Sequence, residues 1–249
     1  MGIGGSPVRI CAAHRGIKKM IKMSKIYKMR IVFHWADQAE GRLDSAAALR
    51  SMLLSGTLPF ARGKQNKNLP RLAYGPSVKQ GQFAAREYAD IYLLESVSTQ
   101  TVRTQLEEHQ PSGFTLLEVK RVPYALAGVQ QLAQVAVYGI EGNFTQPAAA
   151  KTFENYVTAE KVSAVCWSET GVRLVRDVKP FLLGARMLGP QQAELSLCSV
   201  QGKWLNPLEV LQGWSGANTP LDAQRIEQTF KITRQGLYWQ DSQQHLHLI

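Results

Sequence analysis

The sequence has few cysteines and no long hydrophobic run, and each shortage excludes a class of protein. The 249 residues contain only Cys11, Cys166 and Cys198, too far apart to suggest a disulfide framework or a clustered zinc or iron–sulfur site. Charged or amide side chains interrupt every apolar stretch before the roughly 20 residues that a membrane-spanning helix needs. Hydrophobic residues still make up 45% of the chain, which is enough for a real core. We therefore expect a folded, cytoplasmic protein that has no membrane partner and holds no metal or other cofactor.

The motifs typical of nucleotide or metal chemistry are missing as well. No G-x-x-x-x-G-K-[ST] occurs, no G-x-G-x-x-G stands between a strand and a helix, and H-E-x-x-H, G-x-S-x-G and C-x-x-x-C-x-x-C are absent. A small-molecule enzyme that uses His34, Asp44 and Asp177 remains an alternative. These residues show no recognisable spacing of a paired acid and base, so the sequence favours a protein without catalytic activity of its own.

Acidic residues are absent from two segments, and the net charge of +10 originates there. The first 30 residues contain eight basic side chains and no acid, and residues 45–86 contain seven basic side chains and no acid. From residue 87 onward the chain carries 13 basic and 16 acidic residues. The positive charge is thus concentrated in an N-terminal extension and in one internal segment, rather than spread over the chain.

The basic extension, residues 1–28, has three interpretations that stay open. In the first interpretation, translation begins at Met20, Met23 or Met29, and the residues before that start are not part of the natural protein. Apolar residues among the lysines also fit an amphipathic organellar presequence. The third interpretation is a basic arm that binds phosphate groups.

The hydrophobic pattern of residues 29–125 alternates between strand and helix. β-Branched and aromatic runs predict strands, and segments rich in Ala, Leu or Gln behind a polar N-cap predict helices. The expected elements are the strand 30–35, the helix 43–56, the strands 72–76 and 87–95, the helix 98–110 and the strand 114–122. This β-α-β-β-α-β order is typical of a ferredoxin-like fold.

Residues 130–249 predict a second unit of similar make-up. The expected elements are the strand 134–141, the helix 146–160, the strands 162–169, 172–178 and 193–200, the helix 206–214, and 230–240 as one strand or a hairpin. We therefore expect an α+β protein of two lobes that are joined near residues 123–133. The first lobe is a ferredoxin-like unit at 29–125, and the second is a related mixed α/β unit at 130–249.

The loop at residues 61–71, ARGKQNKNLPR, carries the best candidate site. Its four cations, three amide side chains and glycine are suited to hold phosphate groups by charge and by hydrogen bonds. A solvated surface loop remains the alternative, because runs of charge often face solvent. The residues to which we assign phosphate or substrate binding are Asp44, Arg62, Lys64, Asn66, Lys67, Asn68 and Arg71, with Asp44 orienting the loop.

The same segment resembles a known family. Residues 58–91 are similar, without gaps, to the hallmark stretch of the radical-SAM-linked family of uncharacterised bacterial proteins. The matching positions are Leu58, Pro59, Ala61, Pro70, Leu72, Pro76, Gly81, Glu87, Tyr88, Asp90 and Ile91. The segments RLDSAAALR, VRDVKP and NPLEVL extend the resemblance toward the C-terminus. It implies a domain of unknown function, encoded beside or fused to a radical S-adenosylmethionine (SAM) protein, which is then the expected partner.

The chain also departs from that family at two places. The family usually has Ser-His-Leu-Asp before its first helix, where this chain has Gly-Arg-Leu-Asp at residues 41–44. The family usually has Gly-Phe-Asn-Pro-His-Pro in the loop, where this chain has Gln-Asn-Lys-Asn-Leu-Pro at residues 65–70. Both family histidines are therefore replaced, and basic and amide residues have entered the loop, as plain phosphate binding requires.

These observations favour a non-catalytic accessory or substrate-binding protein of a radical SAM enzyme system. It is expected to bind RNA or another phosphate-rich substrate through the loop at residues 61–71. The alternatives are the stand-alone enzyme, with its site between the two lobes, and a purely structural subunit that mediates protein–protein contacts.

Overall fold

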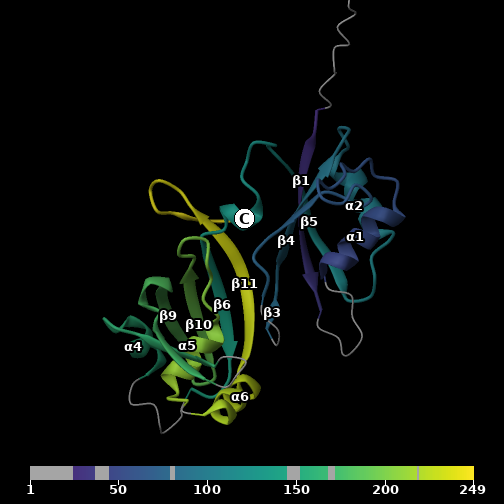
Figure 1. The fold of residues 1–249 in the computed structure, drawn as a ribbon. Coiled ribbons are helices and arrows are strands. Elements are labelled where there is room, and N and C mark those ends of the chain that lie inside the picture. The colour runs from purple at the N-terminus through teal and green to yellow at the C-terminus, as the bar shows by residue number, and fades with distance from the viewer. Residues whose placement is uncertain (1–24, 37–44, 79–81, 145–151, 168–171, 218) are drawn as a thin grey trace, which may run out of the picture.

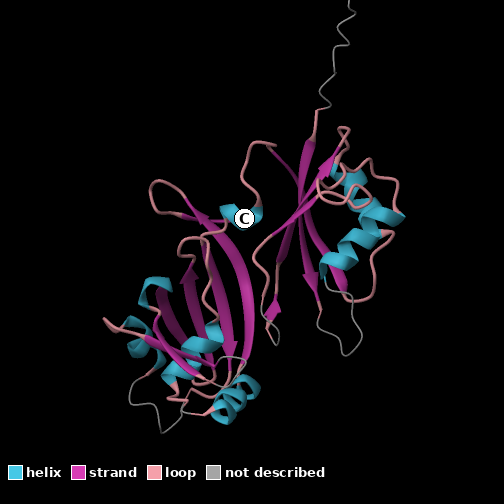
Figure 2. Ribbon diagram, in the orientation of Figure 1, coloured by secondary structure: helices cyan, strands magenta, loops and turns pink. Residues whose placement is uncertain are grey.

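The computed structural model describes residues 25–36, 45–78, 82–144, 152–167, 172–217 and 219–249. Within these residues the chain is a mixed α/β protein with six α-helices and three β-sheets (Figures 1 and 2). No helix in this part of the chain is long and apolar enough to cross a membrane. The elements, in chain order, are β1 (Tyr27–Trp35), α1 (Ser45–Ser55), β2 (Leu72–Tyr74), β3 (Phe83–Ala84), β4 (Glu87–Leu93), α2 (Thr99–Glu107), β5 (Phe114–Val122), α3 (Val129–Leu132), β6 (Val135–Glu141), α4 (Phe153–Thr158), β7 (Ser163–Trp167), β8 (Arg173–Asp177), the 3₁₀ turn η1 (Lys179–Phe181), β9 (Leu182–Gly189), β10 (Gln192–Cys198), α5 (Pro207–Trp214), α6 (Pro220–Thr229), β11 (Lys231–Gln240) and β12 (Leu246–Leu248).

Polar side chains at the first residues of the helices explain where several helices begin. The hydroxyl of Ser98 accepts a hydrogen bond from the backbone N–H of Thr101 at 3.0 Å and caps α2. Asn206 caps α5 in the same way, with Pro207 at the first helical position. Such caps satisfy N–H groups that have no partner inside the helix. The sequence therefore sets these helix starts locally, before any tertiary contact.

The four-stranded sheet has the order β2-β4-β1-β5, and all its strand pairs are antiparallel. Successive side chains of a strand point to opposite faces, so β1 presents two different surfaces. Met29, Ile31 and Phe33 belong to one core cluster together with the buried apolar residues of α1 and α2. These two helices cover that face of the sheet (Figure 1).

The other residues of β1 carry a buried network of charges. Arg30 and Asp90 are direct cross-strand partners, and the guanidinium of Arg30 donates to the carboxylate of Asp90 from Nε at 2.8 Å and from Nη2 at 3.2 Å. Lys28 Nζ lies 3.1 Å from the same carboxylate and donates to the carbonyl oxygens of Leu126 at 2.7 Å and Ala127 at 3.2 Å. None of the three charged side chains is more than 3% exposed. The network therefore ties the segment that follows β5 to the face of the sheet.

The second sheet has the order β12-β11-β6-β10-β9, with β3 paired to β11 in parallel. Its core includes a cluster of four aromatic rings whose centroids lie 5.1–6.3 Å apart: Phe144, Phe153, Trp214 and Phe230. The third sheet is the pair β7-β8, against which α5 packs. Aromatic packing of this kind supplies much of the apolar burial that stabilises a domain of this size.

Apolar and polar contacts join the four-stranded sheet to the six-stranded one, and Val32 of β1 and Tyr88 of β4 belong to the core cluster of the six-stranded sheet. The strand β3, which lies just before β4 in sequence, pairs with Thr233 and Arg234 of β11. The guanidinium of Arg234, which is 1% exposed, donates to the carbonyl oxygen of Pro76 and, at 3.1 Å, to Glu87 Oε2. A buried guanidinium needs such partners, because an unpaired charge in the interior is strongly destabilising.

The structure differs from the sequence-based expectation in several elements. The first strand begins at Tyr27, so Lys28 belongs to the sheet. The helix expected at 146–160 begins at Phe153, while residues 145–151 lie outside the described part of the chain. Residues 231–240 form one continuous strand with an irregularity between Arg234 and Gly236, not a hairpin. The elements β9, α6 and β12 were not expected.

Replacing Asp90 with Asn is expected to lower the free energy of unfolding by about 3–5 kcal/mol, because two buried cations then lose the one anion that the described residues give them. Urea denaturation followed by circular dichroism measures this change. The control is Glu118→Gln, whose exposed carboxylate lies 3.6 Å from Lys120. Its effect should stay within about 1 kcal/mol. Equal effects of the two substitutions would contradict the role given to Asp90.

Candidate functional site

The loop at residues 61–71, here called the basic loop, is shaped by backbone hydrogen bonds at the end of β4. Its base is anchored because the N–H of Ala61 donates to the carbonyl oxygen of Tyr92 at 2.7 Å. Its two arms pair with each other, with Arg71 N–H donating to Ala61 at 2.7 Å and Gly63 N–H to Leu69 at 2.9 Å. A Cβ atom on Gly63 would stand 2.9 Å from the carbonyl oxygen of Asn66, so glycine permits this close turn. The loop is therefore an ordered platform.

Three cations surround a hollow of about 320 Å³ beside this loop, called the cationic hollow below. Lys64 and Arg71 come from the basic loop, and Arg50 comes from α1. The described residues of the lining are Arg50, Gly63, Lys64, Gln65, Asn66, Leu69, Pro70, Arg71 and Leu72, and none of these is acidic. Guanidinium, ammonium and amide donors that converge without a carboxylate are suited to bind an anion such as a phosphate group.

Aromatic rings hold the side chain of Arg71 in place. Its guanidinium lies 4.0 Å from the centre of the Tyr92 ring and 5.8 Å from that of Tyr124, and its Nη1 donates to the Tyr124 hydroxyl at 3.2 Å. This hydrogen bond and the charge of Arg71 lower the pKa of the Tyr124 phenol, and Lys64 lowers that pKa further. The shift follows first from the Arg71 hydrogen bond and then from the positive charges of Arg71 and Lys64, so it agrees with the contact between Arg71 and Tyr124.

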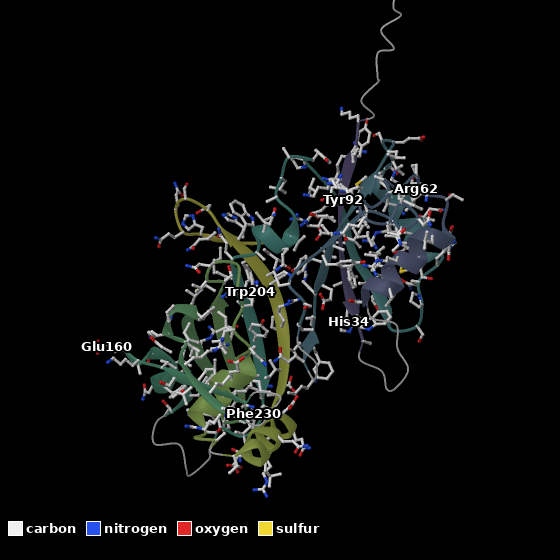
Figure 3. All side chains as sticks on the ribbon, in the orientation of Figure 1. His34, Arg62, Tyr92, Glu160, Trp204 and Phe230 are labelled. Atoms are coloured by element: carbon white, nitrogen blue, oxygen red, sulfur yellow. The ribbon has the colours of Figure 1, made fainter. Side chains whose placement is uncertain are left out.

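The remaining predicted residues of the basic loop do not line the cationic hollow. The exposed guanidinium of Arg62 donates from Nη1 to the carbonyl oxygen of Lys67 at 3.0 Å and lies over the Phe60 ring (Figure 3). Lys67 and Asn68 are exposed, and the N–H of Asn68 donates to Asn66 Oδ1 at 2.9 Å. The structure thus brings Lys64, Asn66 and Arg71 together in the hollow. Asp44, the seventh predicted residue, lies outside the described residues.

Two residues of the enzyme alternative make structural contacts. His34 Nδ1 lies 3.1 Å from the carbonyl oxygen of Ala84, at the end of β1 remote from Tyr92 (Figure 3). Asp177 Oδ1 accepts the backbone N–H of Lys179 at 2.9 Å at the end of β8. In the part of the chain that the structure describes, no group of three or more His, Cys, Asp or Glu side chains is placed to hold a metal ion.

A larger cavity, of about 750 Å³, lies next to the cationic hollow and was not expected from the sequence. Among the described residues, its lining contains aromatic, hydroxyl and carboxyl groups from well-separated segments: Trp35, Ser45, Ala46, Tyr74, Gly75, Pro76, Ser77, Val78, Glu87, Gln130 and Trp204. We call it the aromatic cavity. Its volume falls within the range typical of small-molecule sites.

Glu87 is the only acidic group among the described residues that line the aromatic cavity. Burial raises the pKa of its carboxyl group, and the nearby charge of Arg234 and the hydrogen bond from it act in the opposite direction. The side chain of Glu87 is 16% exposed and that of Arg234 is 1% exposed. Because the two charges offset each other, the cavity carries no net charge from this pair.

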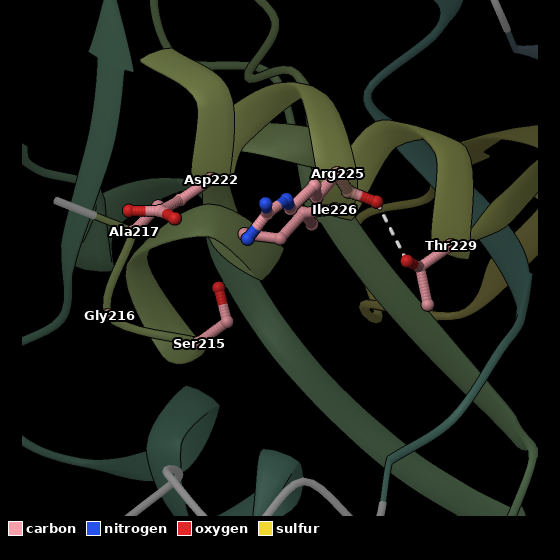
Figure 4. Close-up of a pocket in the computed structure, with 7 residues that line it drawn as sticks. All are labelled: Ser215, Gly216, Ala217, Asp222, Arg225, Ile226 and Thr229. Carbon is pink, nitrogen blue, oxygen red and sulfur yellow. Dashed lines mark hydrogen bonds between the residues drawn. The ribbon is translucent and has the colours of Figure 1, made fainter. Parts of the chain in front are cut away.

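A third hollow, of about 430 Å³, lies between α5 and α6 (Figure 4). Its acidic group among the described lining residues, Asp222, already accepts the N–H of Thr219 at 3.0 Å, and the Thr219 hydroxyl accepts the N–H of Asp222 at 3.1 Å. The hydroxyl of Thr229 donates to the Arg225 carbonyl oxygen at 2.7 Å. These contacts are those of a capped helix, so the hollow needs no ligand to explain its residues.

The fold and the two adjoining hollows describe a mixed α/β protein with a cationic surface site beside an aromatic cavity. A family model described as "Uncharacterized protein conserved in bacteria (DUF2344)" matches residues 41–207, which is more than half of the chain. The chain belongs to this family. No curated protein matches it. The family match agrees with the expectation of a domain of unknown function and includes the basic loop and most of the aromatic cavity.

Replacing Arg71 with Met is expected to raise the pKa of the Tyr124 phenol, because the hydrogen bond and the positive charge that favour the phenolate are both removed. Titration of the tyrosinate absorbance, taken as the difference from Tyr124→Phe, reports this pKa. The matched control is Arg121→Met, which removes the same charge from a guanidinium that bonds Ser96 and Val97 instead. If Arg71→Met leaves the titration of Tyr124 unchanged, the two side chains are not in contact in solution.

Proposed function

We propose that this protein binds RNA or another phosphate-rich substrate through the basic loop, without catalysing a reaction of its own. The observation that carries the proposal is the cationic hollow, in which Arg50, Lys64 and Arg71 converge with no acidic residue in the described lining. Phosphate oxygens are bound in proteins by such combinations of guanidinium, ammonium and amide donors.

The stacking of Arg71 on Tyr92 and Tyr124 supports the same proposal. Held between two rings, the guanidinium loses little freedom when an anion binds, so less of the binding free energy is spent on ordering the side chain. Lys64 and Lys67 are exposed and can follow a flexible phosphate backbone. Exposed cations of this kind give attraction that is strong at low salt and independent of base sequence.

We further infer that the chain is built as two lobes and that the first is ferredoxin-like. The strand order β2-β4-β1-β5, antiparallel throughout and with α1 and α2 on one face, supports this inference. The six-stranded sheet and its helices are the second lobe, and residues 123–133 form the connection. In this organisation the basic loop lies at the edge of the first lobe.

We also propose a radical SAM protein as the partner and the cytoplasm as the location. The support for the partner is the resemblance of residues 58–91 to the radical-SAM-linked family. The wide spacing of the cysteines supports a reducing compartment. Under this proposal the protein presents a phosphate-bearing substrate to the partner enzyme, which performs the chemistry.

Single-stranded RNA is expected to bind the full chain with a log affinity that falls linearly with log salt, at about −0.7 per phosphate contacted. Two to four contacted phosphates give a slope of roughly −1.5 to −3. Replacing both Lys64 and Lys67 with Ala should reduce the magnitude of this slope by roughly one to two. Fluorescence anisotropy of a labelled oligonucleotide at several salt concentrations measures both quantities.

The matched control replaces Lys161 and Lys203 with Ala, which removes equal charge from two exposed positions outside the basic loop. Equal weakening by both pairs would mean that the attraction is diffuse and that the basic loop is not a site. If no RNA binds even at low salt, the nucleic-acid proposal is wrong, and a role in protein–protein contacts becomes the better account.

A further inference from the structure

The aromatic cavity combines flat rings with one carboxylate and lies directly beside the cationic hollow. Trp35, Tyr74 and Trp204 contribute large π surfaces, and Glu87 contributes hydrogen-bond acceptors. Trp204 comes from the segment before α5, far in sequence from the other three residues. The cavity is therefore a product of the tertiary fold.

We propose that the aromatic cavity binds a nucleobase with N–H donors, guanine in the first place, of the ligand whose phosphate occupies the cationic hollow. This inference rests on the proposed function, because the phosphate of the same ligand is assigned to the cationic hollow and its base to the aromatic cavity. The substrate class becomes a guanine nucleotide or an RNA that presents an unpaired guanine.

The rings explain why a base enters. Every nucleobase has a π face, and stacking on an aromatic side chain is a main source of affinity for unpaired bases. Trp35 and Trp204 are both partly buried, so their rings are held by the protein and need little ordering on binding. An aliphatic ligand of the same size would fill the volume without this interaction.

The carboxylate explains why guanine is preferred. Arg234 donates to Oε2 of Glu87, and a carboxylate has acceptor sites for further donors on its two oxygens. The Watson–Crick edge of guanine offers a ring N–H and an amino group side by side, which pair with the two oxygens of a carboxylate. Uracil offers one ring N–H between two carbonyl oxygens, which a carboxylate repels.

Tyr74 joins the aromatic cavity to the cationic hollow. Its hydroxyl donates to the carbonyl oxygen of Ala46 at 2.9 Å, and the guanidinium of Arg50 lies 5.8 Å from its ring centre. Ala46 lines the cavity and Arg50 lines the hollow, one helical turn apart on the same face of α1. Along β2, Leu72 lines the hollow and Tyr74 lines the cavity, and residues two apart in a strand lie on the same face of the sheet. Residues that line the two sites thus lie only about 6–7 Å apart along the backbone of α1 and of β2, so the two sites adjoin.

Isothermal titration calorimetry on the full chain tests the inference with guanosine 5′-monophosphate, uridine 5′-monophosphate and guanosine. Guanosine monophosphate should bind more tightly than uridine monophosphate. Trp204→Ala should weaken guanosine monophosphate and guanosine binding by roughly tenfold or more. Glu87→Gln keeps one side-chain oxygen as an acceptor for Arg234. It should abolish the preference for guanosine monophosphate over uridine monophosphate. The control Trp239→Ala removes an equal ring that stacks on His247, outside the cavity, and should leave binding unchanged.

The Lys64→Ala and Lys67→Ala pair separates this inference from the proposed function. The pair should weaken guanosine monophosphate and RNA but leave guanosine, which has no phosphate, unaffected. If RNA binding depends on the lysines while Trp204→Ala changes no affinity and no base preference, the cavity inference is wrong and the proposed function stands. If guanosine binding depends on Trp204 while RNA and phosphate do not bind, the proposed function is wrong. Absence of binding by both guanosine and its monophosphate overturns the inference.

Discussion

The buried contact of Asp90 with Arg30 and Lys28 is the constraint on which the arrangement of the whole chain depends. One carboxylate faces two cations in the interior, and the surplus positive charge is satisfied by the backbone carbonyls of Leu126 and Ala127. The chain after β5 must therefore pass over this face of the sheet, since any other path would leave the cations without acceptors. This passage decides where α3 and the six-stranded sheet begin.

The same constraint positions both candidate sites. Tyr124 stands two residues before Leu126, so fixing that segment brings its ring and hydroxyl to Arg71. Gln130, in the helix that follows, reaches the aromatic cavity. On the other side, Arg234 and β3 hold the end of β2 and the start of β4 against β11. These contacts bring Gln130 and Trp204 to the residues of α1, β2 and β4 that line the aromatic cavity, whereas the described lining of the cationic hollow comes from α1, the basic loop and β2 alone.

Much of the first sheet follows from local sequence, whereas parts of the second do not. The runs that became β1, β4 and β5 are rich in β-branched and aromatic residues, so these strands were predictable. The helix α2 was predictable from its N-cap, Ser98, and from the apolar Val102 and Leu106 one turn apart. The strand β9 contains two glycines and alternates between buried and exposed residues only weakly, and its pairing with β10 decides its conformation. The helix α6 did have a signal, because Thr219 and Asp222 form a capping box and Pro220 stands at the first helical position. Lys28 was assigned to the extension because no local pattern reveals that its charge is buried.

The candidate sites show the same division between local and tertiary information. Their electrostatics agree with the proposal that they bind different parts of one ligand. The acid-free run pointed to Lys64, Asn66 and Arg71, but Arg50 enters the hollow only through the packing of α1, and Trp204 reaches the cavity from a distant segment. In the hollow, the described lining residues include no acidic group to balance the cations, so the binding of an anion is electrostatically favoured. In the cavity Arg234 offsets Glu87, and transfer of a phosphate beside that carboxylate would add repulsion without a free cation. A neutral, flat group with N–H donors meets no such penalty. Under the proposals above, a ligand with an anionic end and an aromatic end has one favoured orientation, with its base toward the six-stranded sheet.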